Sequence, residues 1–134
     1  MRNTAREVAL NIIFAQQFNN DCLDVLKKKV FKQFKLEKEE DIAFANALIS
    51  AVDANREELI AGIEEACHHY LQNRINPTDK SILLIAMAEI KYFDEIPAVV
   101  SVSEAAGLAR KYSTDKSADF VNGVLSGVIN KKES

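Results

Sequence analysis

The chain has 134 residues, of which 48% are hydrophobic and 28% are charged, a composition that excludes an intrinsically disordered protein. Its four glycines and two prolines leave few tight turns, which favours long helices over a β-sandwich or barrel. The sequence has neither the run of roughly 18 apolar residues that a membrane span needs nor the basic start and apolar segment of a signal peptide. We therefore expect one cytoplasmic domain that spans residues 1–134.

Charge is distributed unevenly along the chain, whose net charge is −3. Residues 1–35 carry seven basic and three acidic side chains, whereas residues 36–134 carry ten basic and seventeen acidic ones. A basic first quarter on an acidic body can confine an anionic ligand to one face, and a row of solvated lysines gives the same pattern. Charge alone does not choose between the two interpretations.

The first helix is predicted to start near Thr4, because Thr4-x-x-Glu7 has the form of a capping box. An apolar stripe at helical spacing follows, formed by Ala5, Val8, Ile12 and Ala15. Leu10, Ile13 and Phe14 point away from this stripe. A helix that is apolar on two sides is either enclosed in the core, which is the commoner case, or offers a contact patch to a partner.

The next three helices are predicted within residues 21–74. Val25, Phe31 and Phe34 define a helix through a lysine-rich stretch, most of whose lysines we interpret as its solvated face. Residues 38–74 contain almost no helix breaker, and their apolar periodicity predicts two helices divided around residues 53–55, the second reaching Tyr70 and Leu71.

Three further helices are predicted in the second half. Asn76 and Pro77 form an N-cap and a first helical position, and they open a nearly apolar core helix that ends before Pro97. Ser101-x-x-Glu104 is a second capping box and predicts a helix from Ser101 to Tyr112, followed by a last helix over residues 117–129. No segment alternates in the manner of a strand, so we predict an all-α fold of six or seven helices.

Cysteine and histidine give no sign of a metal site. Cys22 and Cys67 are isolated, and we expect both to be small buried hydrophobic residues rather than a disulfide. His68 and His69 are adjacent, so on a helix they lie about 100° apart and cannot both reach one ion. The sequence also lacks a glycine-rich phosphate loop and a nucleophile with its base. We therefore expect that the protein binds neither a metal nor a cofactor and that it is not an enzyme.

Several motifs share their order and spacing with a known family. They are the segments 5–17, 79–90, 95–100, 103–112 and 120–125. The most specific is Phe120-Val121-Asn122-Gly123-Val124-Leu125, which follows a proline and a Glu-Ala pair. Together they resemble the NusB family of bacterial transcription antitermination factors over the length of the chain, with residues 20–75 the loosest part.

The resemblance implies an all-α fold of two packed helical sub-bundles and a role in antitermination during ribosomal RNA synthesis. It implies binding of the boxA segment of nascent, single-stranded leader RNA, together with the ribosomal protein NusE, within a larger complex on RNA polymerase. No cofactor and no reaction are implied.

The resemblance also carries over individual positions. The RNA-binding set would be Arg2, Arg6, Phe14, Gln17, Phe120 and Asn122. Glu89 would contact NusE, although a carboxylate on an apolar helix can instead bond to a neighbouring helix. The chain departs from the family where Leu84 replaces the usual arginine, where Ala88 replaces the usual aromatic, and where only two arginines remain near the N-terminus.

Other functions fit the same residues. A related helical domain occurs at the N-terminus of some RNA cytosine methyltransferases, and this chain ends about where such a domain ends. A protein–protein adaptor would need no dense arginine cluster. The apolar patch on the first helix could also form a homodimer.

Overall fold

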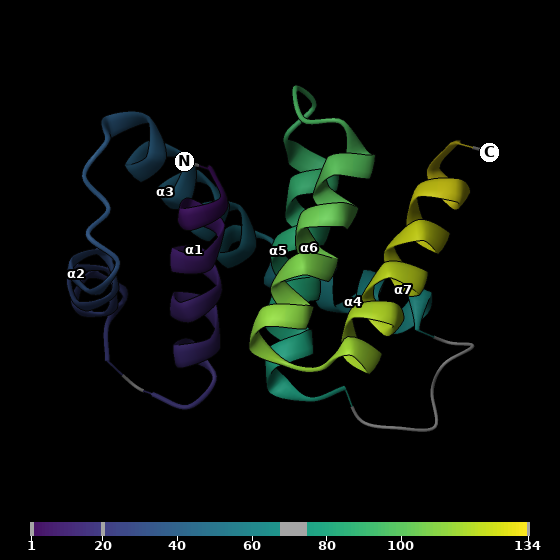
Figure 1. Cartoon of the computed structure of the whole chain (residues 1–134), viewed down its shortest axis with the longest axis horizontal. Helices are drawn as coiled ribbons and strands as arrows, with labels where there is room; N and C mark the ends of the chain where they lie inside the picture. Colours follow the sequence, from purple (N-terminus) through teal and green to yellow (C-terminus); the bar gives the residue numbers. More distant parts are fainter. Residues whose placement is uncertain (1, 20, 68–74, 134) are drawn as a thin grey trace.

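The computed structural model describes residues 2–19, 21–67 and 75–133, and in these ranges it consists of seven α-helices without a strand. In chain order they are α1 (Arg2–Gln16), α2 (Leu23–Gln33), α3 (Glu39–Ala54), α4 (Arg56–Ala66), α5 (Pro77–Tyr92), α6 (Ala98–Tyr112) and α7 (Asp115–Glu133) (Figure 1). The all-α prediction is confirmed. None of these helices is long and apolar enough to cross a membrane.

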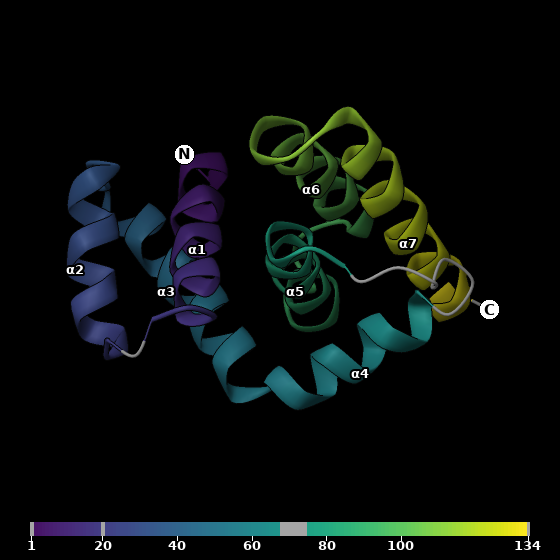
Figure 2. The ribbon, with the colours of Figure 1, turned by 90° about the horizontal axis from the view of Figure 1, so that it is seen from below.

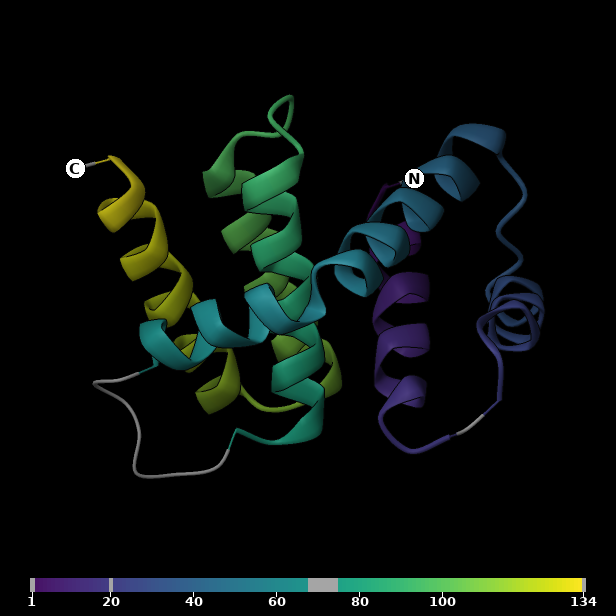
Figure 3. The same cartoon turned by 180° about the vertical axis from the view of Figure 1, so that it is seen from behind.

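The helices form two packed groups, as expected. α1, α2 and α3 make up one sub-bundle, and α4 to α7 make up the other (Figure 2). α3 and α4 follow one another across the back of the molecule and so connect the two groups (Figure 3). α5 contacts α1 and α3 on one side and α4, α6 and α7 on the other. α5 is therefore the helix on which both sub-bundles pack.

The sequence of α5 explains this central place. Asn76 caps the helix by accepting a hydrogen bond from the backbone N–H of Asp79 at 2.8 Å, and Pro77 occupies the first turn. All residues from Ser81 to Ile90 are buried. Burying an apolar surface on every side of one helix is the main contribution of such an element to stability. The predicted cap and core helix are confirmed.

Three helix starts differ from the prediction. α1 begins at Arg2 rather than at Thr4, and the guanidinium of Arg2 extends the packing by lying 4.7 Å from the ring centroid of Phe44. α6 begins at Ala98, because the hydroxyl of Ser101 bonds to Glu89 instead of capping a helix. α7 begins at Asp115, where Thr114 accepts a hydrogen bond from the N–H of Ser117.

The doubly apolar helix α1 is largely a core helix. Leu10 and Ile13 are at most 3% exposed, because α1 packs against α2, α3 and α5. Phe14 is 37% exposed, so the core interpretation is correct for two of the three residues and wrong for Phe14.

The two cysteines differ from each other. Cys67 is buried as expected, and burial raises the pKa of its thiol above the ordinary value. Cys22 is exposed, contrary to the prediction, because it precedes the first turn of α2 and does not share the buried side of that helix. Both are free thiols. The predicted helical positions Tyr70 and Leu71 lie outside the described residues.

Candidate nucleic-acid interface

A buried ion pair joins the two sub-bundles. Arg6 on α1 donates from Nε to Oε2 of Glu89 at 2.9 Å and from Nη2 to Oε1 at 2.5 Å. Ser101 on α6 donates from its hydroxyl to Oε1 of Glu89 at 3.0 Å. Arg6 is 4% exposed and Glu89 is 1% exposed. A two-pronged pair of this kind fixes orientation as well as distance.

This network bears on two residues that the resemblance assigned to ligands. Arg6 was expected on RNA and Glu89 on NusE, but both side chains lie inside the protein. The remaining terminal nitrogen of Arg6, Nη1, lies 3.3 Å from the side-chain oxygen of Asn3. Glu89 is bonded to neighbouring helices, as the alternative interpretation had it, because a carboxylate on an apolar helix needs partners for its oxygens. Direct ligand contacts by either residue stay predictions and would require the network to open.

Arg2 differs from Arg6 in being exposed. Its guanidinium lies over the ring of Phe44. The guanidinium of Arg6 lies 5.3 Å from the centroid of the same ring. A guanidinium on an aromatic face keeps its charge and much of its hydrogen-bonding edge. Arg2 can therefore bind a phosphate while its guanidinium stays stacked on the ring of Phe44.

Phe14 and Gln17 lie at the opposite end of α1. Phe14 stands 12 residues beyond Arg2, about 18 Å along the helix axis. Gln17 donates from Nε2 to the hydroxyl of Ser81 at 2.7 Å and to the carbonyl of Pro77 at 3.1 Å. Gln17 thus ties the end of α1 to the start of α5. The expected RNA residues on α1 therefore fall at both ends of the helix.

Phe120 and Asn122 lie in the first turns of α7. The end of α1, the start of α5 and the start of α7 face the same edge of the molecule, the lower one in Figure 1. Phe120 is half-buried and packs against the core, whereas Asn122 is exposed. The structure therefore brings Phe14, Gln17 and these two α7 residues toward one edge, and leaves Arg2 apart.

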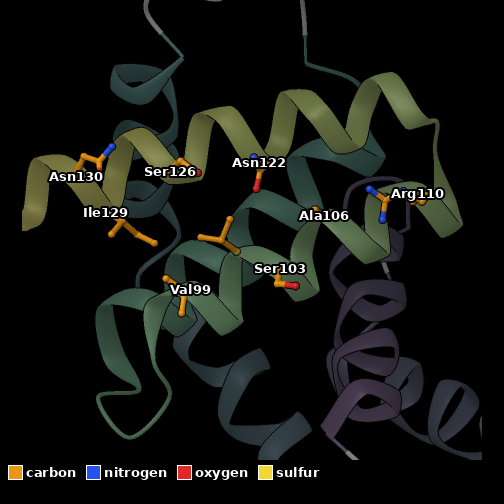
Figure 4. A pocket seen from close by; sticks show the side chains of 9 residues that line it. Val99, Ser103, Ala106, Arg110, Asn122, Ser126, Ile129 and Asn130 are labelled. Carbon is orange, nitrogen blue, oxygen red and sulfur yellow. The ribbon is translucent and has the colours of Figure 1, made fainter.

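Asn122 lines a pocket of about 410 Å³ between α6 and α7 (Figure 4). Its apolar lining residues are Val99, Val102, Ala106 and Ile129. Its polar lining residues are Ser103, Arg110, Asn122, Ser126 and Asn130. Asn122 points from α7 toward α6 in this view. The pocket thus combines an apolar lining with amide, hydroxyl and guanidinium groups.

Sequence reasoning missed Arg110, Ser126 and Asn130 as possible site residues. The signal was present, because Ser126 and Asn130 follow Asn122 at successive spacings of four and so share one face of α7. Arg110 lies 3.8 Å from the carboxylate of Asp115, and both side chains are largely exposed. Such a surface pair is weak, so the guanidinium remains free to bind an anion.

A second, smaller pocket of about 260 Å³ lies between α1 and α6. Its lining includes Asn3, Glu7, Glu104 and Lys111. Glu7 accepts hydrogen bonds from Lys111 at 2.5 Å and from the hydroxyl of Tyr112 at 2.7 Å. Burial, reinforced by the bond to Glu7, raises the pKa of Tyr112 to about 12. These contacts link the sub-bundles a second time.

Within the described ranges no group of three or more His, Cys, Asp or Glu side chains could hold an ion. The adjacent His68 and His69 lie outside those ranges.

Comparison with known proteins identifies the family. The model of the NusB family matches residues 3–130. The transcription antitermination protein NusB of Natranaerobius thermophilus is 35% identical over 132 residues, which are 97% of this chain and 95% of that protein. NusB of Listeria innocua is 36% identical over 127 residues, 95% of this chain and 94% of that protein.

A solved structure shares the fold. It is a crystal structure of the antitermination factors NusB and NusE in complex with double-stranded RNA, and it matches with a TM-score of 0.84 and 21% identity over 97% of this chain and 96% of that chain. The match over nearly the whole sequence, at more than 30% identity to curated relatives, is decisive: the chain belongs to the NusB family of transcription antitermination factors.

Proposed function

We propose that this chain binds boxA-type leader RNA together with NusE and so takes part in the antitermination complex on RNA polymerase. The observation that carries the proposal is the pocket between α6 and α7. Its apolar lining suits the face of a base, and the amide of Asn122 can both donate to and accept from a base edge. Arg110 at its rim supplies a cation for a phosphate.

The RNA is single-stranded where it meets this surface, because a base must be unpaired to enter a pocket or to stack on a ring. Phe14, which is 37% exposed at the same edge, supports stacking. The solved complex of NusB and NusE holds double-stranded RNA. A duplex competitor therefore belongs in the experiment, and we expect it to bind more weakly than the single strand.

NusE supports RNA binding by adding basic surface. Of the two N-terminal arginines only Arg2 is exposed, since Arg6 is held by Glu89. One phosphate contact gives little affinity at physiological salt. Linkage then requires that the factor by which NusE raises RNA affinity equals the factor by which RNA raises NusE affinity.

The same burial of Arg6 favours a second candidate, a protein–protein adaptor that meets NusE without RNA. Binding without catalysis is our proposal in both cases. It is supported by the antitermination role of the curated relatives. A factor that acts on nascent bacterial RNA works in the cytoplasm.

The test is a titration of labelled boxA-type RNA by fluorescence anisotropy, with the full chain and with or without NusE. We expect binding that NusE strengthens, and we expect Asn122→Ala to weaken it by about 1 kcal/mol, or about fivefold. Ser50→Ala, an exposed change on α3, is the control and should leave binding unchanged. Binding of NusE without any binding of RNA would favour the adaptor.

A further inference from the structure

The turn after α1 presents a pair of aromatic rings to solvent. Phe18 is 66% exposed, and its ring centroid lies 5.1 Å from that of Phe14 at an angle of 54°. The backbone of the turn is fixed by hydrogen bonds from Gln17 to the carbonyl of Phe14 and from Phe18 to that of Ala15, both 3.1 Å long. Two rings left in water cost hydrophobic free energy, and a fixed pair is a surface on which bases stack.

The helix that follows presents a row of cations. Residues 27–35 contain five lysines and no acidic residue. Lys28, Lys29 and Lys32 are exposed. Lys28 and Lys32 lie on the side of α2 opposite the buried Leu26 and Val30, and Lys29 lies at the flank of that side. In the part of the chain that the structure describes, none of the three forms an ion pair. We name these three residues the α2 lysine face.

The ring pair and the α2 lysine face belong to neighbouring elements at one end of the molecule (Figure 2). α2 packs on α1 and lies alongside it at one end of the molecule (Figure 2). Phe18 lies in the loop between these two helices. Val25, which is 45% exposed, stands among the lysines on the outer side of α2. Aromatic or apolar groups interleaved with cations are the pattern of surfaces that hold single-stranded nucleic acid.

We infer that Phe18 and the α2 lysine face form a second segment of the RNA path. Phe18 stacks on an unpaired base, and the three lysines hold the phosphates of the strand as it leaves the edge where Phe14 lies. This inference rests on the proposed function and adds a contact region to it. Residues 36–134 carry more acids than bases, so the first quarter of the chain is where a long anion is attracted.

The experiment uses the full chain, with NusE present, and two labelled RNAs. One is a short boxA-type RNA, and the other is the same RNA extended at either end by about eight uridines, a length within the range of single-strand binding sites. One variant combines Lys28→Gln, Lys29→Gln and Lys32→Gln, and a second is Phe18→Ala. The charge-matched control combines Lys38→Gln, Lys91→Gln and Lys111→Gln, three exposed lysines outside the pocket between α6 and α7. A further variant, the arginine triple, combines Lys28→Arg, Lys29→Arg and Lys32→Arg and retains the charge. Circular dichroism checks that each variant folds.

We expect the wild-type chain to bind the extended RNA more tightly than the short one. The glutamine triple should abolish this gain and reduce the slope of log affinity against log salt by up to about two units, since each phosphate contact of a single strand contributes about 0.7. Phe18→Ala should weaken the extended complex about fivefold or more. Short RNA, the control triple and the arginine triple should behave like wild type.

Three results would overturn the inference while the proposed function stands. The extension could add nothing to wild-type affinity, the control triple could lose as much as the lysine triple, or polyglutamate could compete as well as oligouridine. The last result would make the surface a docking site for an acidic protein. If the wild-type chain binds neither RNA, the proposed function and the inference both fall.

Discussion

The guanidinium of Arg6 and the carboxylate of Glu89 form a buried two-pronged ion pair, although 83 residues separate them in the sequence. One belongs to α1 and the other to α5, so the pair fastens the first sub-bundle to the second. Ser101 completes the network from α6. This buried contact therefore helps to hold the two sub-bundles, and with them the ends of α1 and α7, in their relative positions.

Glu89→Lys should therefore destabilise the protein. The change places a second cation beside Arg6 in a site that is at most 4% exposed, and breaking a buried pair from one side costs about 3–5 kcal/mol. Urea unfolding followed by circular dichroism measures the loss. The double variant Arg6→Met with Glu89→Leu should lose much less, because it leaves no buried charge unpaired.

An exposed pair provides the comparison for this prediction. Arg110 lies 3.8 Å from Asp115, and both side chains are largely exposed, so Arg110→Met should cost at most about 1 kcal/mol of stability. If Glu89→Lys folds as stably as wild type and NusE binding alone is lost, the carboxylate acts at the partner interface and the buried pair contributes little.

Lys35 ends α2 in a conformation that suits glycine. Its φ is 52°, and the N–H groups of Lys35 and Leu36 donate back to the carbonyls of Lys32 and Phe31 at 3.2 and 3.0 Å. This is the bonding of a Schellman motif, in which a residue with a Cβ is strained. Lys35→Gly should raise the free energy of unfolding by about 1 kcal/mol. Lys28→Gly, which removes the same charge from the helix interior, should lower it by about 1 kcal/mol.

Stability should fall in the alkaline range because of Tyr112. Its pKa is raised to about 12 by burial and by the bond to Glu7, so the folded chain holds this proton after the unfolded chain has released it. The contribution is fully present below about pH 10, the ordinary pKa of tyrosine, and is lost as the pH rises toward 12. Chemical unfolding at a series of pH values measures it, and Tyr112→Phe should remove this part of the decline. An identical decline in the variant would place its cause elsewhere.

Local signals in the sequence predicted the parts of the fold that depend on neighbours in the chain. Asn76, Pro77 and the apolar run after them were sufficient for α5, because cap and periodicity lie in the same segment. The capping box at Ser101 gave a wrong helix start, because its hydroxyl is bonded to Glu89 on another helix. No pattern within one segment reveals a contact of that kind.

In the candidate site, too, features that depend on local sequence could be predicted, whereas features that depend on packing between helices could not. The motif around Asn122 was evident from the sequence, and the structure adds the neighbours on α6 that make it a pocket. Periodicity found that α1 is apolar on two sides, but it could not tell that neighbouring helices cover Leu10 and Ile13 while Phe14 stays in solvent. Likewise, Arg2 and Arg6 look equivalent in the sequence, and only packing separates the exposed cation from the buried one.

Because Arg2 is exposed and Arg6 is buried, replacing one or the other should have different effects in an RNA titration. If Arg2 contacts a phosphate, Arg2→Ala should reduce the slope of log affinity against log salt by about 0.7 for single-stranded RNA and weaken binding about equally across RNA sequences. Arg6→Ala should chiefly lower the free energy of unfolding, because its charge is already neutralised by Glu89.

The measurement is a salt series with boxA-type RNA and with a scrambled RNA, each in the presence of NusE, alongside urea unfolding of both variants. Lys91→Gln controls for the loss of one surface cation, since Lys91 pairs with Glu58 on the surface and lies in neither pocket. If Arg6→Ala changes the salt slope while its stability matches wild type, the ion pair opens in the complex and Arg6 reaches the RNA. If Arg2→Ala and Lys91→Gln give the same slope as wild type, the phosphates are held elsewhere, and Arg110 and the α2 lysine face become the cations to substitute next.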